Sequence, residues 1–469
     1  MNQSIKNMSL LGLVALIVTT IVGGGIFNIP SDIARHSGIA SIMIGWFITG
    51  IGMLCLALLF QNLSHKKKDL NAGIYSYAKD GFGPLLGFTS AWGYWTSAFV
   101  GNIAYLLMLF ETLSYFFPIF NSPLYTFIGA SLIIWGLYFL IASGLREVSI
   151  INVIITCAKL IPLLFFVIVM CFFLKLDNLK LDFWGNKVNG TLLEQVKQTM
   201  LVTVWVFIGI EGAIVVSSRA KRRKDIGLAT VIGFLSTMFL YIFITFITLS
   251  AIPRDIVIKM SNPSLVYALE FVLGKYGACI MIVGLIISIV GALLGWTILA
   301  IEIPFTAACD KTMPKIFSKK NSKGTPIFSL LFTTLCVHLF IGISLFFSKN
   351  YQSMYFVASA AILIPYALSA LYNLKLILVS KIKAVEIISK DLIVTIIACL
   401  YSTWLIFAAL EPLLLCSIIY TVGLFIFIIE KWRNKEKIFT CLEFIVASVI
   451  IITALVSLVL FSKNLIHLQ

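Results

Sequence analysis

The chain has 469 residues, of which 60% are hydrophobic and 12% are charged, and its mean hydropathy is +1.04. Soluble globular proteins carry about 25% charged residues, so this composition excludes a soluble protein and predicts a polytopic membrane protein. The net charge of +15, from 35 Lys and Arg against 20 Asp and Glu, would suit a nucleic-acid-binding protein only if the basic residues shared one soluble face.

Long apolar windows organise the whole chain. A helix needs about 20 apolar residues to cross the hydrocarbon core of a bilayer, and no linker is long enough to hold a separate soluble domain. We expect the first apolar run to be retained as a helix, because no small-residue cleavage site follows it. The windows predict thirteen spans, at residues 9–35, 38–63, 84–117, 123–143, 147–174, 193–218, 227–252, 276–309, 326–347, 351–379, 391–410, 412–430 and 439–461.

The basic residues predict how the chain crosses the membrane. With a cytoplasmic N-terminus and alternating sides, 24 of the 35 basic residues fall in cytoplasmic segments, 9 fall on the opposite side and 2 lie within or at the edge of spans. This distribution follows the positive-inside rule. We therefore expect a multi-pass protein of the cell (inner or plasma) membrane with an external C-terminus, whose basic loops set the topology and contact anionic lipids.

Several other classes of protein are disfavoured by what the chain lacks. The nine cysteines lie within or at the ends of apolar runs, without CxxC pairs and without histidines at metal-ligand spacing, so we expect small buried hydrophobes and neither a disulfide framework nor a metal site. No nucleophile–base pair or channel filter is visible. We therefore expect no enzyme, no channel and no cofactor.

Two predicted spans are interrupted by glycines, and they lie five spans apart. Residues 21–27 read IVGGGIF and residues 207–212 read FIGIEG. Each Gly costs a helix interior about 1 kcal/mol relative to Ala, so both runs predict unwinding. Close helix packing is the alternative explanation for a single run. Breaks at matching positions of two halves instead indicate the binding site of a transporter.

Around these breaks the sequence resembles the amino acid–polyamine–organocation superfamily, and within it the basic amino acid/polyamine antiporters. The resemblance covers residues 9–380, and a thirteenth span departs from the family's usual twelve. Among the subfamilies it is closest to arginine/ornithine antiporters and less close to arginine/agmatine exchangers. The segments that carry it are 21–30 (IVGGGIFNIP), 73–83 (GIYSYAKDGFG), 91–105 (AWGYWTSAFVGNIAY), 200–225 (MLVTVWVFIGIEGAIVVSSRAKRRKD), 291–314 (GALLGWTILAIEIPFTAACDKTMP) and 363–375 (LIPYALSALYNLK).

The resemblance implies an all-α integral membrane fold of about 12–13 transmembrane helices with an inverted five-helix repeat. Helices 1 and 6 would be discontinuous. The single transporter domain, residues 1–469, would hold a first repeat in 9–174, a second, inverted repeat in 193–379 and additional C-terminal helices in 391–461.

A basic amino acid brings a carboxylate, an α-ammonium and a cationic side chain to the bilayer midplane, where each group needs a partner. An unwound glycine run exposes backbone N–H groups at the start of a half-helix, which is a site for a carboxylate. We predict this site at Gly23, Gly24 and Gly25. For the α-ammonium we predict the carbonyl groups freed at Ile21 and at 207–210, among them Ile208.

The cationic side chain would meet aromatic faces and neutral amides. Cation–π contacts contribute about 0.5–2 kcal/mol, and Trp is the best partner. Trp205 and Trp296 match positions that gate or stack on the substrate in related antiporters, although a Trp taken alone is also typical of an interfacial anchor or of core packing. By the same resemblance, the distal pocket would be lined by Ser97, Ala98 and Asn102.

Ionisable groups inside spans are functional candidates by default. Glu211, inside the second break, would hold that loop together or titrate during coupling, and Glu302 would couple or pair with another helix. For Glu111 and Glu411, near span ends, we favour structural roles. Some superfamily members carry a lysine where sodium-coupled relatives bind sodium, so Lys159 implies sodium-independent transport, or else an ion pair with a carboxylate such as Glu302.

These observations lead to one hypothesis with two alternatives. The leading one is an antiporter that exchanges external L-arginine for internal ornithine by alternating access. An arginine/agmatine antiporter and a proton-coupled lysine or arginine permease are the alternatives. The expected partners are a small cationic amino acid, its exchange product and the lipid bilayer, with no nucleic acid and with a homodimer as one allowed assembly.

Overall fold

The computed structural model describes residues 8–67, 69–70, 73–188, 190–216, 220–222, 224–346, 351–383 and 390–463. Within these residues the chain is helical and contains no β-strand. Some basic residues of the predicted loops, among them Lys6, Lys68 and Arg219, lie outside the described residues. Ten of the described helices are long and apolar enough to cross a membrane.

The helices follow the predicted spans closely. In chain order they are α1 (Leu10–Ile21), α2 (Ile29–His36), α3 (Ile39–Lys66), α4 (Ile74–Phe82), α5 (Pro84–Leu113), α6 (Pro123–Ser143), α7 (Leu145–Cys171), α8 (Leu192–Phe207), α9 (Gly212–Val215), α10 (Lys224–Ala251), α11 (Arg254–Val257), α12 (Ser264–Leu273), α13 (Lys275–Cys309), α14 (Ile327–Phe346), α15 (Tyr351–Lys383), α16 (Lys390–Ala408), α17 (Leu410–Arg433) and α18 (Cys441–Ser462).

Each of the thirteen predicted spans falls on helix. The predicted breaks in spans 1 and 6 are also present, as the interruptions between α1 and α2 and between α8 and α9. The structure adds α4, α11 and α12, which are too short to span a bilayer and were not among the predicted spans. The fold is therefore all-α with discontinuous helices 1 and 6.

Local sequence explains where several of the helices begin. α5 and α6 start at Pro84 and Pro123, because proline at the first helical position lacks only an N–H that would have no partner there. α8 starts with a capping box, in which Thr191 and Glu194 bond to one another's backbone N–H groups. α18 starts with a second capping box, and the carboxylate of Glu443 also accepts a 2.9 Å hydrogen bond from the N–H of Leu85 in α5.

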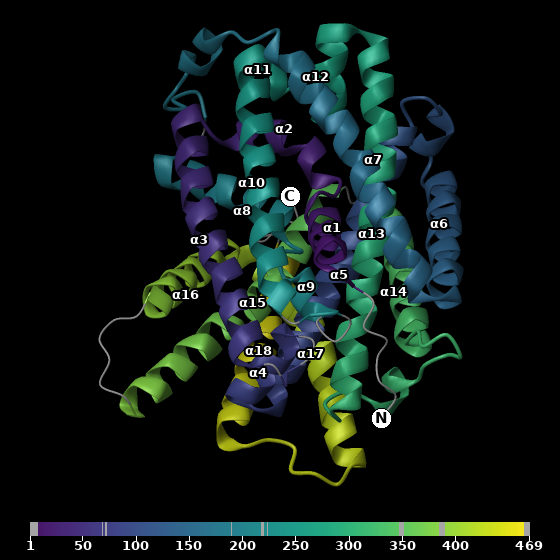
Figure 1. Ribbon diagram of the computed structural model, residues 1–469, viewed down its shortest axis with the longest axis vertical. Coiled ribbons are helices and arrows are strands. Elements are labelled where there is room, and N and C mark those ends of the chain that lie inside the picture. The colour runs from purple at the N-terminus through teal and green to yellow at the C-terminus, as the bar shows by residue number, and fades with distance from the viewer. Residues whose placement is uncertain are drawn as a thin grey trace.

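The bundle is built around the two broken helices. α5 is central, with 89% of its most apolar stretch buried, and packs against α13 and α15, while α1 packs against α7, α10 and α13. Figure 1 shows that α2 runs from the middle of the molecule toward the end that carries α11 and α12, whereas α9 and α4 lie toward the opposite end. We call these two ends the α2 end and the α4 end.

The cysteine prediction was wrong in part. Cys55 and Cys416 are buried, but Cys157, Cys171, Cys309 and Cys441 are exposed. α18, which begins at Cys441, has only 17% of its apolar stretch buried although its mean hydropathy is the highest of the ten candidate spans. Hydropathy does not distinguish a protein interior from a lipid-facing surface, because both are apolar.

Candidate functional site

The first break is a tightly packed turn at mid-bundle. α1 ends at Ile21, a single 3₁₀ turn covers Gly25–Phe27, and α2 begins at Ile29. All of these residues are buried. Glycine is required by close approach, because a Cβ atom would come within 2.4, 2.6 and 2.9 Å of a neighbouring side chain at the three glycines, namely Tyr105 at Gly23, Met108 at Gly24 and Trp205 at Gly25.

The turn leaves three buried backbone N–H groups without a hydrogen-bond partner within the described part of the chain. They belong to Gly24, Gly25 and Ile26. An unpaired buried N–H is costly, and nearly all such groups in folded proteins find a partner. These donors lie just before the N-terminus of α2, where the helix dipole also favours negative charge. The sequence predicted these donors at Gly23, Gly24 and Gly25, but the N–H of Gly23 donates to the carbonyl of Ile21 at 2.8 Å, so the unpaired donors begin one residue later.

The carbonyl groups of the same break, in contrast, are held by side chains from other helices. Lys159 of α7 is fully buried, and its ammonium donates to the carbonyls of Thr19, at 2.9 Å, and Val22. Ser288 of α13 donates to Val22 and Gly23, at 3.2 and 3.1 Å. Lys159 thus takes the backbone of α1 as its partner rather than a carboxylate.

Two aromatic residues complete this set of carbonyl partners. Tyr241 of α10 donates to the carbonyl of Ile21 at 2.7 Å, and Trp296 of α13 donates to the carbonyl of Thr20 at 3.1 Å. The predicted α-ammonium acceptor at Ile21 is therefore already engaged. The indole of Trp296 anchors α1, and its ring lies 6.4 Å from that of Tyr94.

The second break supplies free carbonyl groups. Gly209 lies in the left-handed region at φ +111°, which favours glycine, and its carbonyl accepts a 3.2 Å hydrogen bond from Thr20, which ties the two breaks together. Within the described residues, the carbonyls of Ile208 and Ile210 accept no hydrogen bond. The second break therefore presents unpaired acceptors, whereas the carbonyls around the first break are engaged.

Glu211 joins the second break to α15. One carboxylate oxygen accepts from the hydroxyl of Tyr366, at 2.5 Å, and from the N–H of Gly209, at 3.3 Å. The other oxygen is buried and has no partner among the described residues, with the Tyr94 hydroxyl beside the carboxylate. The side chain therefore bonds both to the unwound loop and to α15, and its other oxygen is unpaired among the described residues.

A group of aromatic side chains packs against the first break. Trp205 is 6% exposed and donates from its indole to the hydroxyl of Tyr351 at 2.8 Å. Its ring stacks on that of Tyr355, with centroids 5.6 Å apart, and is tilted against that of Tyr105 at 5.4 Å. We call Tyr105, Trp205, Tyr351 and Tyr355 the aromatic lid.

The remaining predicted residues divide between the site and its surroundings. Ser97, Ala98 and Asn102 are buried on α5, and the Ser97 hydroxyl and the Asn102 amide oxygen have no partner among the described residues. Asn102 also donates to Thr297 of α13 at 3.2 Å. Glu302 is buried on α13 and lies six residues beyond Trp296, about 9 Å along the helix.

Tyrosines are the functional candidates that sequence reasoning missed. Tyr94, Tyr105, Tyr241, Tyr351 and Tyr366 all contact the breaks, the aromatic lid or Glu211. The sequence offered one signal for them, which is their position inside predicted spans. A tyrosine hydroxyl needs a hydrogen-bond partner when it is buried. Which partner each one finds depends on helix packing.

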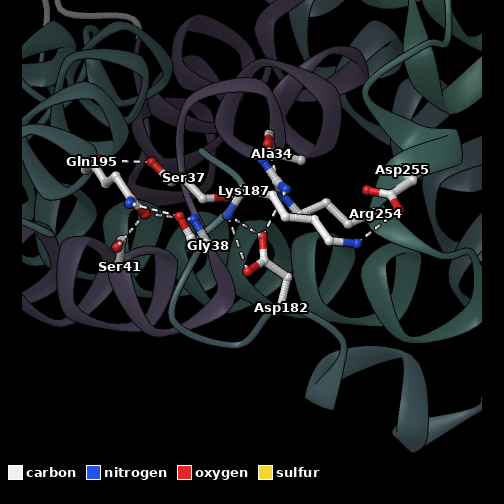
Figure 2. A network of polar contacts seen from close by, with 10 residues as sticks. Ala34, Ser37, Gly38, Ser41, Asp182, Lys187, Gln195, Arg254 and Asp255 are labelled. Carbon is white, nitrogen blue, oxygen red and sulfur yellow. Dashed lines mark hydrogen bonds and ion pairs between the residues drawn. The ribbon is translucent and has the colours of Figure 1, made fainter. Parts of the chain in front are cut away.

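A polar network fastens α2 at the α2 end of the bundle. Arg254 of α11 donates to the carbonyls of Ala34 and Ser37, at 2.9 and 3.2 Å, and lies 3.5 Å from the carboxylate of Asp182. The two charged side chains are only 7% and 10% exposed. Burial lowers the pKa of Arg254, while Asp182 and Asp255 raise it. Figure 2 shows this arginine between the end of α2 and the Asp182 loop.

The same network continues to α8. The side-chain oxygen of Gln195 accepts hydrogen bonds from the N–H of Gly38 and from the hydroxyl of Ser41, both at 2.9 Å. Ser37 donates to the backbone carbonyl of Gln195 at 2.7 Å (Figure 2). The junction between α2 and α3 is therefore fastened to α8 by several buried hydrogen bonds.

Ion pairs hold α4 at the opposite end. Lys67 lies 3.1 Å from the carboxylate of Asp80, which also accepts from the hydroxyl of Tyr372 in α15. This hydroxyl and Lys67 hold the pKa of Asp80 below its usual range, although burial opposes them. Lys79 donates to the carbonyl of Asp310 at 2.9 Å. The short helix α4 thus links α3, α13 and α15.

Two broken helices meeting in the middle of an apolar helical bundle, with free donors at one break and free acceptors at the other, define a multi-pass membrane transporter. The chain belongs to the amino acid permease family, whose model matches residues 8–413. This confirms the resemblance found in the sequence.

Several relatives match nearly the full length of the chain, among them one from Pseudomonas aeruginosa and one from Chlamydia pneumoniae. The chain is 41% identical over 468 residues to the arginine/ornithine antiporter of Pseudomonas aeruginosa, with 97% of each chain covered. It is 37% identical over 476 residues to the arginine/agmatine antiporter of Chlamydia pneumoniae, with 98% of each chain covered.

Proposed function

We propose that the protein is an antiporter that exchanges external L-arginine for internal ornithine. The observation that carries the proposal is the pairing of the two breaks, which offer the free N–H groups of Gly24, Gly25 and Ile26 to a carboxylate and the free carbonyls of Ile208 and Ile210 to an α-ammonium. An α-amino acid presents both groups on one carbon. The names of the relatives support arginine and ornithine as the pair.

The side chain of the substrate would extend toward α5 and α13. The Asn102 amide oxygen and the Ser97 hydroxyl are unpaired acceptors there, and Trp296 and Tyr94 supply aromatic faces for a cation. The unpaired oxygen of Glu211, beside the hydroxyl of Tyr94, would respond to the arriving positive charge. Trp205, in the aromatic lid, would separate the site from the α2 end.

Alternating access would follow from the two repeats, residues 9–174 and 193–379, moving against one another around the breaks. The N-terminus would be cytoplasmic, so the α4 end would face the cytoplasm and the α2 end the exterior. Lys159 supports transport that does not depend on sodium, because its fixed ammonium already occupies the carbonyls of Thr19 and Val22.

Ornithine is favoured over agmatine by the first break. Arginine and ornithine both carry a carboxylate that satisfies the free N–H groups of Gly24 and Gly25. Agmatine lacks a carboxylate, so it would leave these buried donors unpaired, at a cost of about 1–3 kcal/mol for each group. The proton-coupled permease remains an alternative because the unpaired oxygen of Glu211 would also accept a proton.

Counterflow in proteoliposomes tests the proposal. Vesicles that contain the full-length protein are loaded with ornithine, agmatine, lysine or no substrate, and the uptake of labelled arginine is followed with sodium or choline outside. We expect fast uptake against ornithine, slower uptake against agmatine, little uptake into empty vesicles and no effect of sodium. Uptake into empty vesicles as fast as into loaded ones would refute exchange and favour the permease.

A further inference from the structure

One side chain of the first broken helix is seated inside the second break. Thr20, in the last turn of α1, is fully buried, and three glycines surround its side chain. A Cβ atom would come within 2.9 Å of this side chain at Gly209 and within 3.4 Å at Gly212, both at the second break. At Gly295 of α13 the distance would be 3.2 Å. The threonine thus fits here because its neighbours carry no side chain.

The hydroxyl of Thr20 has more acceptors than it can use at once. Its oxygen lies 2.9 and 3.0 Å from the carbonyls of Leu16 and Ile17 in its own helix, and 3.2 Å from the carbonyl of Gly209. A hydroxyl carries one hydrogen. It therefore donates either within α1, as threonine does to the preceding turn of a helix, or across to the second break.

Neither choice leaves a buried group without a partner. The carbonyl of Gly209 also accepts a 2.9 Å hydrogen bond from the N–H of Gly212, so it keeps one donor when the hydroxyl of Thr20 turns away. The hydroxyl in turn keeps an acceptor in α1. An unmade hydrogen bond in a protein interior is destabilising, and this arrangement avoids it in both positions. The bond between the breaks is therefore easily reversible.

The same bond joins two groups of contacts on opposite sides of the site. On one side, the indole of Trp296 in α13 donates to the backbone carbonyl of Thr20. On the other side, the N–H of Gly209 donates to the carboxylate of Glu211, which also accepts from Tyr366 of α15. A movement of α1 away from the second break would interrupt this line between Thr20 and Gly209.

We propose that Thr20 is a positioning residue that joins the two breaks reversibly, by turning its one hydroxyl hydrogen from α1 to the carbonyl of Gly209. We call this contact the Thr20 latch. The inference rests on the proposed function, in which the substrate bridges both breaks, and goes beyond it by naming the protein group that keeps them together. The latch holds the breaks at the spacing at which one amino acid reaches both. When the hydroxyl turns back to α1, the breaks are free to part.

Hydrogen–deuterium exchange of backbone amides tests the latch. The exchange rate of a segment reports how often that segment opens. The full-length protein is studied in detergent without substrate, and exchange is followed in residues 207–215 and, as an internal reference, in α18. Thr20→Val removes the hydroxyl and keeps the β-branched shape. We expect exchange in 207–215 to become about three- to tenfold faster, which is the effect of one hydrogen bond, with no change in α18.

The chain offers a matched control on α10. The hydroxyl of Thr237 also lies 2.9 Å from two carbonyls of its own helix, those of Gly233 and Phe234, but it has no third acceptor among the described residues. Thr237→Val should therefore leave exchange in 207–215 at the wild-type rate. Thr20→Ser keeps the hydroxyl and should restore that rate as well. Equal rates in Thr20→Val and the wild type, or the same acceleration in Thr237→Val, would overturn the latch.

Two further measurements keep the test decisive. Thr20→Ala also lacks the hydroxyl and gives the same comparison if Thr20→Val is not recovered in folded form. Addition of arginine separates the latch from the proposed function, because a substrate that bridges both breaks should slow exchange in 207–215 in the wild type and in Thr20→Val. Faster exchange in Thr20→Val with no slowing by arginine would support the latch and contradict the proposed binding of arginine.

Discussion

Replacement of Gly23 by Ala tests how closely the first break depends on its neighbours. The added Cβ atom would lie 2.4 Å from the hydroxyl oxygen of Tyr105, 2.7 Å from its Cζ and 3.0 Å from its Cε1. All three nearest atoms belong to this one ring. Since Gly23 has no positive φ, the substitution introduces a steric conflict without backbone strain, and a single side chain must yield.

The magnitude follows from the packing of that ring. An extra methyl group in a well-packed interior costs about 1–3 kcal/mol, and each 1.36 kcal/mol is a factor of ten. Tyr105 cannot move without disturbing its 5.4 Å contact with Trp205 in the aromatic lid. We therefore expect Gly23→Ala to weaken arginine binding about ten- to hundredfold and to lower the melting temperature of the purified protein.

The assay is a double-mutant cycle with Tyr105→Leu. Arginine affinity and thermal stability are measured for both single variants and for the double variant, in detergent. Because Leu lacks the ring atoms that conflict with the new methyl group, the double variant should lose at least about 1 kcal/mol less than the sum of the single losses. Gly136→Ala on α6 is the control, because nothing lies within 4 Å of its added Cβ. Strictly additive losses would refute the packing argument.

Three further predictions concern buried polar contacts. Lys159→Met should lower the free energy of unfolding by about 1–3 kcal/mol, since carbonyls of α1 lose a donor; an unchanged melting temperature would contradict this. Arg254→Lys should slow arginine exchange more than Asp182→Asn does, because only Arg254→Lys removes the guanidinium hydrogen bonds to the carbonyls at the end of α2. A larger loss of initial uptake rate in Asp182→Asn would show that these hydrogen bonds are not what fastens α2. Trp205→Phe and Tyr351→Phe remove the same 2.8 Å hydrogen bond, so combining them should cost no more exchange activity than the worse single variant.

Hydropathy and glycine content predicted most of the fold because both act locally. Each span must bury its own backbone groups within the bilayer, and each glycine run weakens the helix in which it lies. The short helices α4 and α12 (Ser264–Leu273) escaped prediction because they lack the length and apolarity of a span. The exposure of several cysteines escaped prediction because a lipid-facing surface, such as that of α18, is as apolar as the core.

The site was predictable only in its backbone part. Glycines at 23–25 indicated free N–H groups; in the structure the N–H groups of Gly24 and Gly25 have no partner among the described residues, whereas that of Gly23 donates to the carbonyl of Ile21. The direction of the Trp296 indole was not predictable, because its acceptor is a carbonyl 276 residues away in sequence. The same holds for Tyr241, whose hydroxyl reaches the carbonyl of Ile21 across 220 residues. Such pairs depend on which helix faces meet.

Under the proposed function, the two breaks would divide the recognition of an amino acid between them. At the first break the carbonyls of residues 19–23 are occupied by side chains of α7, α10 and α13, so this break presents donors only. At the second break the carbonyls of Ile208 and Ile210 are free, so it presents acceptors. Under the proposed function, a substrate that bears both a carboxylate and an ammonium would need both breaks in place, and a movement that separates them would remove one partner and favour release. Since these proposed partners are backbone groups, the +15 charge of the chain would have no direct part in the binding of the substrate head group.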